Sequence, residues 1–241
     1  MKKQPQTKII GIDCATQPKK VGLALCRWTE NRLMVDTLRT GADSRPLHQV
    51  ISDWIPDEGA LLAMDAPLGW PQGLAPALVQ HRAGQALATT PEKMFRRTTD
   101  DFVWEMTGKK PMEVGAERIA RTAHAALRLL NEISILRGTT IPLCWTADTL
   151  SRGQVAAIEV YPAGLMAALG VKRPSREDKI SALERLTDLG AMSIDESVTA
   201  DMVDAVLCAV AGADFLQGKC YAPSPKQLPV AKKEGWIWVR R

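Results

Sequence analysis

The sequence predicts an α/β fold with one mixed five-stranded sheet, flanking helices and a helical insertion between the fourth and fifth strands. Three observations support this prediction. Three short apolar runs follow one another within the first 40 residues, as in a meander of strands. A fourth apolar run ends in Asp65, and a fifth, at residues 154–162, follows a long segment with helical periodicity. The closing part of the chain is again helical in pattern, which is typical of α/β domains.

The first three strands are predicted at residues 8–13, 21–28 and 33–40. Their sequences are KIIGID, VGLALCRW and LMVDTLRT, and the first ends in Asp13. The polar segment TENR, residues 29–32, separates the second strand from the third and predicts a hairpin turn. These three strands should therefore form an antiparallel meander.

An amphipathic helix is predicted at residues 46–55, with a proline at its first position and apolar residues at helical spacing. The fourth strand, ALLAMD at residues 60–65, is short, apolar and flanked by Gly59 and Pro67. Such a run is typical of a strand that is buried on both faces. A second strand therefore ends in an aspartate.

The helical insertion is predicted at about residues 68–153 and contains a long amphipathic stretch at 116–136. The whole chain, 1–241, is expected to form a single domain. After the fifth strand, helices are predicted at 163–170, 175–190 and 199–216. The tail at 229–241 ends in an alternating apolar patch, which indicates an edge strand or a docking arm.

Composition narrows the class of protein. Of the 241 residues, 46% are hydrophobic and 24% charged, which excludes a disordered chain. The formal net charge of +4 allows a nucleic-acid partner without requiring one. No run approaches the roughly 18 apolar residues of a membrane span, so no membrane partner is expected. Five cysteines without a CxxC pair indicate neither a zinc site nor a disulfide framework, and favour a cytoplasmic location.

Carboxylates gather where the predicted sheet ends. The order of elements matches the RNase H-like fold, whose sheet order is 3-2-1-4-5, so the first and fourth strands are neighbours. Asp13 and Asp65 should then lie side by side at the edge where sites form in α/β sheets. Asp201 and Asp204 share one face of the closing helix because they are three residues apart. Glu159, at the end of the fifth strand, could join them.

Clustered like charges need a compensating cation, and hard divalent ions with oxygen ligands meet that need. We therefore expect Mg²⁺ or Mn²⁺, with Asp13, Asp65 and Asp204 as principal ligands. Asp201 and Glu159 would complete the catalytic set. Two such ions stabilise the attacking and leaving oxygens of a phosphodiester, which predicts a nuclease acting on nucleic acid.

Four motifs resemble those of a widespread domain-of-unknown-function family described as predicted RNase H-like nucleases. They are IIGIDCA, LLAMDAPLGWP, IEVYPAGLMAALG and ADMVDAVLCAVAGA, and they span most of the chain. The resemblance implies an acidic site at the same five carboxylates: Asp13, Asp65, Glu159, Asp201 and Asp204.

The family also tends to carry an Arg-x-x-Asp segment after the fourth strand, matched here by RRTTDDF with Arg96, Arg97 and Asp100. We expect Arg96 and Arg97 to contact substrate phosphates. Where the family often has a histidine before the first aspartate of the closing helix, this chain has Ala200. A proton-transfer role for that histidine is therefore absent or supplied elsewhere.

Other interpretations stay open. Glu159 could pair with a nearby Arg or Lys, Asp201 could stabilise the helix dipole, and the two arginines could form a solvated surface. The motif GIDCAT also resembles the first phosphate loop of actin-like and sugar-kinase-like ATPases, although those proteins normally have two such domains. A non-catalytic binding protein of the same fold is the third alternative.

Overall fold

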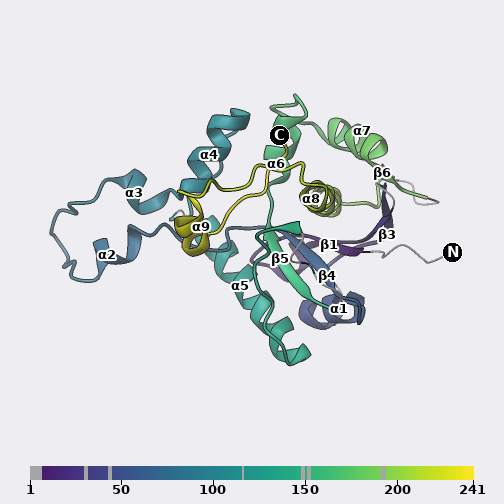
Figure 1. Ribbon diagram of the computed structural model, residues 1–241, viewed down its shortest axis with the longest axis horizontal. Coiled ribbons are helices and arrows are strands. Elements are labelled where there is room, and N and C mark those ends of the chain that lie inside the picture. The colour runs from purple at the N-terminus through teal and green to yellow at the C-terminus, as the bar shows by residue number, and fades with distance from the viewer. Residues whose placement is uncertain are drawn as a thin grey trace.

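The computed structural model describes residues 7–29, 32–42, 45–115, 117–147, 150, 153–190 and 194–241. Six strands form one mixed sheet in the order β5-β4-β1-β2-β3-β6 (Figure 1). Three neighbouring pairs are parallel, β1 with β4, β4 with β5 and β3 with β6. The strands are β1 (Thr7–Asp13), β2 (Gly22–Thr29), β3 (Arg32–Thr40), β4 (Ala60–Asp65), β5 (Val155–Glu159) and β6 (Thr187–Asp188).

Strand β6 corrects the prediction of a five-stranded sheet. The five predicted strands keep their relative order, but β6 extends the sheet beyond β3. It pairs in parallel with Leu33 and Met34. Two residues are too few to leave a period-two pattern, and residues 187–188 lay inside a predicted helix. Residues 30 and 31 of the predicted polar turn, and the first residue of the predicted helix at 116–136, lie outside the described residues.

Helices cover both faces of the sheet (Figure 1). The first face carries α6 (Pro162–Ala168), α7 (Arg176–Leu186) and α8 (Ala200–Leu216). The opposite face carries α1 (Leu47–Trp54) and α5 (Glu117–Arg137). Side chains alternate between the two faces along each strand. On β1, Ile9 packs toward α8, whereas Ile10 and Ile12 pack toward α1 and α5.

Helix α8 touches the sheet backbone to backbone. A Cβ atom at Gly11 would lie 1.9 Å from the carbonyl oxygen of Ala205. A Cβ atom at Gly22 would lie 1.9 Å from the carbonyl oxygen of Asp201. Both distances are far shorter than any real contact of a methyl group, so only glycine lets the helix approach this closely. The approach fixes the start of α8 over the ends of β1 and β2.

The segment between β4 and β5 contains α5 and three shorter helices, part of which projects from the sheet (Figure 1). These are α2 (Leu74–Leu78), α3 (Pro91–Phe95) and α4 (Thr98–Thr107). After α8 the chain forms α9 (Leu228–Glu234). The tail then lies against β5, where the backbone N–H of Trp238 donates to the carbonyl of Glu159 at 3.0 Å. It thus pairs with an edge of the sheet.

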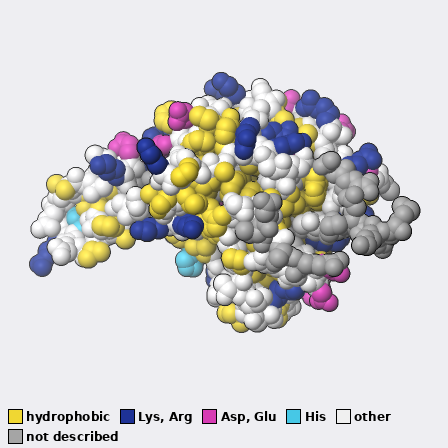
Figure 2. Space-filling model, viewed as in Figure 1, with side chains coloured by type: hydrophobic (Ala, Val, Ile, Leu, Met, Phe, Trp, Pro, Cys, Tyr) yellow, Lys and Arg dark blue, Asp and Glu magenta, His cyan; other side chains and the backbone are white. Residues whose placement is uncertain are grey.

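The surface carries charges of both signs without one dominant patch on the face shown in Figure 2. None of the helices in the described ranges combines the length and the hydropathy that crossing a membrane requires.

Candidate functional site

Asp13 and Asp65 are partners in the register of β1 and β4, each at the last residue of its strand. Two residues earlier on each strand, Gly11 contacts α8 and Ala63 belongs to the α8-side core. Because side chains alternate along a strand, both carboxylates also face α8. As expected, the two aspartates therefore lie side by side at the C-terminal ends of β1 and β4.

Helix α8 brings two more carboxylates to the same edge. It begins after Thr199, whose side chain accepts a hydrogen bond from the backbone N–H of Met202 at 3.2 Å. Asp201 lies in the first turn, which the contact at Gly22 presses onto the sheet. Asp201 and Asp204 both raise the pKa of Asp13. The closing helix thus adds negative charge close to the strand-end pair, Asp13 and Asp65.

The strand-end carboxyls titrate far above the usual aspartate pKa of about 4. Burial, with Asp65, Asp204 and Asp201 nearby, raises the pKa of Asp13 to about 8. Burial, with Asp204 and Glu159, raises the pKa of Asp65 to about 7. Among the described residues, neither Asp13 nor Asp65 has a hydrogen-bond or ion-pair partner. The pair is costly for folding and carries two carboxyl groups without a side-chain partner, which suits a ligand site better than a purely structural one.

Lys179, which was not among the predicted site residues, supplies a positive charge to this cluster. Its ammonium group donates to both carboxylate oxygens of Asp204, at 2.7 and 2.8 Å. It also lowers the pKa of Asp13 and of Asp65, against the larger effects that raise them. Helix α7 buries Ala182 and Leu183, three and four residues after Lys179. A charge on the apolar face of an amphipathic helix was the signal that could have revealed it.

The donors fit a hard divalent cation in kind, because Asp13, Asp65 and Asp201 offer carboxylates without a partner in the described chain. The arrangement is not a preformed cage. Within the described ranges, no three His, Cys, Asp or Glu side chains converge closely enough to hold one ion. The third expected ligand, Asp204, is engaged by Lys179. An ion would therefore compete with the ammonium group for Asp204.

Glu159 is close enough to raise the pKa of Asp65, but it faces the other side of the sheet. It pairs in register with Met64, whose side chain packs on the α1 and α5 side of the sheet. Glu159 accepts hydrogen bonds from Arg97 at 2.7 and 2.9 Å and from the backbone N–H of Leu68 at 3.0 Å. These contacts agree with the alternative interpretation, in which Glu159 pairs with a nearby arginine.

Arg97 is 1% exposed, which excludes the alternative interpretation of Arg97 as part of a solvated surface. Besides Glu159, its guanidinium group donates to Asp100 at 2.8 and 3.2 Å and to the carbonyl oxygen of Glu234 at 3.1 Å. Arg97 thereby ties α4, β5 and α9 together. Arg96 points elsewhere, pairs with Glu113 at 3.0 Å and lies 5.3 Å from the ring centre of Trp104.

A cavity of about 220 Å³ opens beside Asp65. Tyr161 lines it, a residue inside the quoted motif IEVYP that the sequence analysis did not select. Burial, together with Asp65 and Asp100, raises the pKa of Tyr161 to about 12, so its hydroxyl stays protonated at neutral pH and can donate a hydrogen bond. The other lining residues are Cys14, Ala66, Pro67, Arg97, Pro111, Met112, Ile119, Thr122, Glu159, Val160 and Ile237.

The buried arginine gives the first testable prediction. Arg97→Met should destabilise the protein by about 3–5 kcal/mol, because two buried carboxylates lose their cation. Arg96→Met, one residue away, should cost clearly less, since Arg96 is paired at the surface. Urea denaturation measures both. Equal losses for the two variants would contradict the structural role of Arg97.

The raised pKa values give the second prediction. Between pH 4 and pH 8, folded Asp13 retains a proton that the unfolded chain has lost, so stability without added metal falls as the pH rises. Asp13→Asn removes the contribution of Asp13 to this loss of stability. Between pH 4 and pH 8 the loss should therefore be smaller by roughly 2–3 kcal/mol, with allowance for partial exposure of the carboxyl. Asp57→Asn, at an exposed position, is the control. Parallel pH profiles for wild type and Asp13→Asn would refute the buried pair.

Comparison with known proteins places the chain in a family. None of the curated proteins that were compared with it matches. A family model described as "Protein of unknown function (DUF429)" matches residues 11–228, which include Asp13, Asp65 and the α8 carboxylates. This match confirms the resemblance to a domain-of-unknown-function family. The description of the family names no activity. The chain belongs to the DUF429 family.

Proposed function

We propose that the protein is an RNase H-like, metal-dependent nuclease that hydrolyses phosphodiester bonds in nucleic acid. One observation carries the proposal: Asp13 and Asp65 lie side by side at two strand ends, partly buried and without a side-chain partner in the described chain. Clustered carboxylates of this kind bind divalent ions, and divalent ions at such a site serve phosphoryl chemistry.

Sheet topology supports the RNase H-like part of the proposal. Strand β2 is antiparallel to β1 and β3, whereas β4 and β5 run parallel to β1. The order β3-β2-β1-β4-β5 within the sheet agrees with the order 3-2-1-4-5 expected for that fold. The added strand β6 lies at the edge far from β4 and leaves the strand-end pair unchanged.

Asp13, Asp65 and Asp204 would hold Mg²⁺ or Mn²⁺, with Asp201 beside them. When bound, the ion would stabilise charge on the attacking and leaving oxygens of the phosphodiester. We leave Glu159 and Arg97 out of this set because they form an ion pair with each other in the wall of the cavity beside Asp65.

The chain's own residues would position the substrate. The cavity beside Asp65 would receive the part of the substrate next to the bond that breaks, and the Tyr161 hydroxyl would donate a hydrogen bond to a phosphate oxygen. Lys179 keeps Asp204 oriented and offsets part of the negative charge before an ion arrives. Together these residues would act by orientation and charge.

The ATPase alternative needs a second domain of the same kind. The described residues form one sheet of six strands, so they supply half of that arrangement. A non-catalytic binder differs from a nuclease only in the outcome of an activity assay. Both alternatives are therefore decided by measurement of hydrolysis.

Metal binding gives the third prediction. Mg²⁺ or Mn²⁺ should stabilise the folded protein, by about 2.7 kcal/mol at 100 times the Kd. The stabilisation should shrink in Asp13→Asn and Asp65→Asn and persist in Asp57→Asn. Lys179→Met should lower the metal-free melting temperature and enlarge the metal-induced rise, because the ion then has no competitor for Asp204. Thermal unfolding with and without metal measures these changes, and equal shifts in all variants would exclude the site.

Activity is the fourth prediction. With Mg²⁺ or Mn²⁺, the protein should cut at least one member of a panel of single-stranded, duplex, hybrid and branched nucleic acids. Asp13→Asn should lower the rate at least 100-fold, an order of magnitude typical for the loss of an electrostatic stabiliser in an active site. Asp57→Asn should cut like wild type.

If no substrate is cut, or if Asp13→Asn cuts as well as wild type, the nuclease proposal fails. ATP hydrolysis by the same proteins then separates the two alternatives, because an ATPase releases phosphate and a binder does not.

A further inference from the structure

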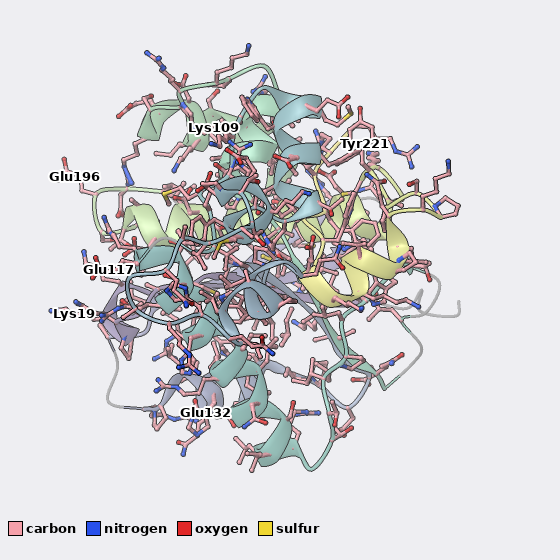
Figure 3. All side chains as sticks on the ribbon, turned by 90° about the vertical axis from the view of Figure 1, so that its left-hand side faces the viewer. Lys19, Lys109, Glu117, Glu132, Glu196 and Tyr221 are labelled. Atoms are coloured by element: carbon pink, nitrogen blue, oxygen red, sulfur yellow. The ribbon has the colours of Figure 1, made fainter. Side chains whose placement is uncertain are left out.

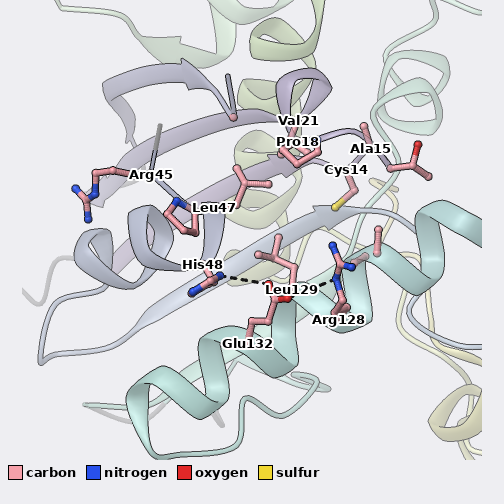
Figure 4. Close-up of a pocket in the computed structure, with 15 residues that line it drawn as sticks. Cys14, Ala15, Pro18, Val21, Arg45, Leu47, His48, Arg128, Leu129 and Glu132 are labelled. Atoms are coloured by element: carbon pink, nitrogen blue, oxygen red, sulfur yellow. Dashed lines mark ion pairs between the residues drawn. The ribbon is translucent and has the colours of Figure 1, made fainter. Parts of the chain in front are cut away.

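A second cavity, of about 380 Å³, lies between α1, α5 and the segment that follows β1 (Figure 4). Its apolar lining includes Val21, Leu47, Ala126 and Leu129. The size is in the range of pockets that hold small organic ligands. An apolar wall of this kind accepts a flat, uncharged group such as a nucleobase.

Charged side chains at the cavity are mostly basic. Arg45, two residues before α1, lies at the rim with its guanidinium group turned outward, and Arg128 comes from α5 (Figure 4). Among the described residues, the lining contains a single acid, Glu132, which His48 contacts at 3.3 Å and Arg128 at 3.4 Å (Figure 4). Arg45 pairs with Asp53, which is not part of the lining. The described lining residues by themselves therefore carry a net positive charge, which Asp53 offsets in part.

These ion pairs are exposed, which leaves both arginines available to an incoming anion. The side chains of Arg45 and Arg128 are 49% and 64% exposed. Ion pairs in such positions are weak and exchange readily with competing anions. A guanidinium group binds phosphate oxygens in a bidentate manner, so phosphate is the anion that suits this rim best.

The cavity lies next to the carboxylate site along the chain. Cys14, Ala15 and Thr16, which line it, directly follow Asp13. Cys14 also lines the smaller cavity beside Asp65, so the two cavities share one wall residue. Helix α5 borders both, with Thr122 on the smaller cavity and Arg128 on the larger. Figure 3 shows α5 from the side, with Glu117 and Glu132 labelled along it.

We propose that the cavity between α1 and α5 binds one nucleotide of single-stranded nucleic acid, next to the site of hydrolysis. Its phosphate lies at Arg45 and Arg128, and its base on the apolar wall. The assignment of substrate class rests on the proposed function. A single unpaired nucleotide fits a cavity of 380 Å³, whereas a duplex holds its bases paired and stacked outside it.

Binding to the full chain tests the proposal without catalysis. The probes are adenosine 5′-monophosphate, inorganic phosphate, adenosine and a short oligothymidylate, titrated by calorimetry in the absence of divalent metal. We expect the mononucleotide and the oligonucleotide to bind, and adenosine to bind at least tenfold more weakly because it lacks the phosphate.

Four variants locate the binding. Arg128→Gln and Arg45→Gln should each weaken mononucleotide binding about tenfold. Ala125→Leu should fill the cavity and abolish binding without a change of charge. Arg121→Gln is the matched control, since Arg121 lies on the same helix, is 73% exposed and is absent from the lining. Circular dichroism checks that every variant is folded.

The proposal is overturned if no nucleotide binds at millimolar concentration, or if Ala125→Leu binds as well as wild type. It is also overturned if Arg121→Gln weakens binding as much as Arg128→Gln, because the effect would then be general electrostatics. Asp13→Asn should keep nucleotide binding. A protein that binds nucleotide in this cavity yet cuts nothing therefore refutes the nuclease while leaving the binding site standing.

Discussion

The contact between α8 and the sheet is the constraint on which the candidate site depends. Gly11 and Gly22 let the helix backbone meet the strand backbones directly, and larger residues at either place would push the helix outward. The contact holds the first turn of α8 over the strand ends, where Asp13 and Asp65 face it. If α8 could not approach this closely, its carboxylates would move away from those at the ends of β1 and β4, which come from a distant part of the chain.

The close approach creates an electrostatic cost that the chain only partly relieves. Lys179 supplies one positive charge, and it contacts Asp204 rather than the strand-end pair. The pKa values of about 8 and about 7 for Asp13 and Asp65 show that the remaining repulsion and burial favour the protonated forms. A fold that maintains such a pair gives up stability, which is common where a site must be ready for a ligand.

Sequence periodicity predicted the positions of the strand-end aspartates but not those of the residues around them. Asp13 and Asp65 each end an apolar run, so strand prediction located them directly. The position of Glu159 depended on the register between β4 and β5, which pairs it with Met64 and turns it to the other face. Register is a tertiary property, as is the burial of Arg97, whose Arg-Arg-Thr-Thr segment has the composition of an exposed loop. Strand β6 was too short to leave a pattern.

In the nuclease that we propose, the two faces of the sheet would have different tasks. On the α8 face, carboxylates concentrate negative charge where ions would bind. On the opposite face, Arg45 and Arg128 border an apolar cavity that would repel such ions and attract phosphate. The segment that follows Asp13 links the two, because Asp13 ends β1 and the next residues, Cys14 to Thr16, line the cavity. Under the proposal, a nucleic-acid strand bound along α5 would pass the C-terminal ends of β1 and β4, where Asp13 and Asp65 turn toward α8 on the other face.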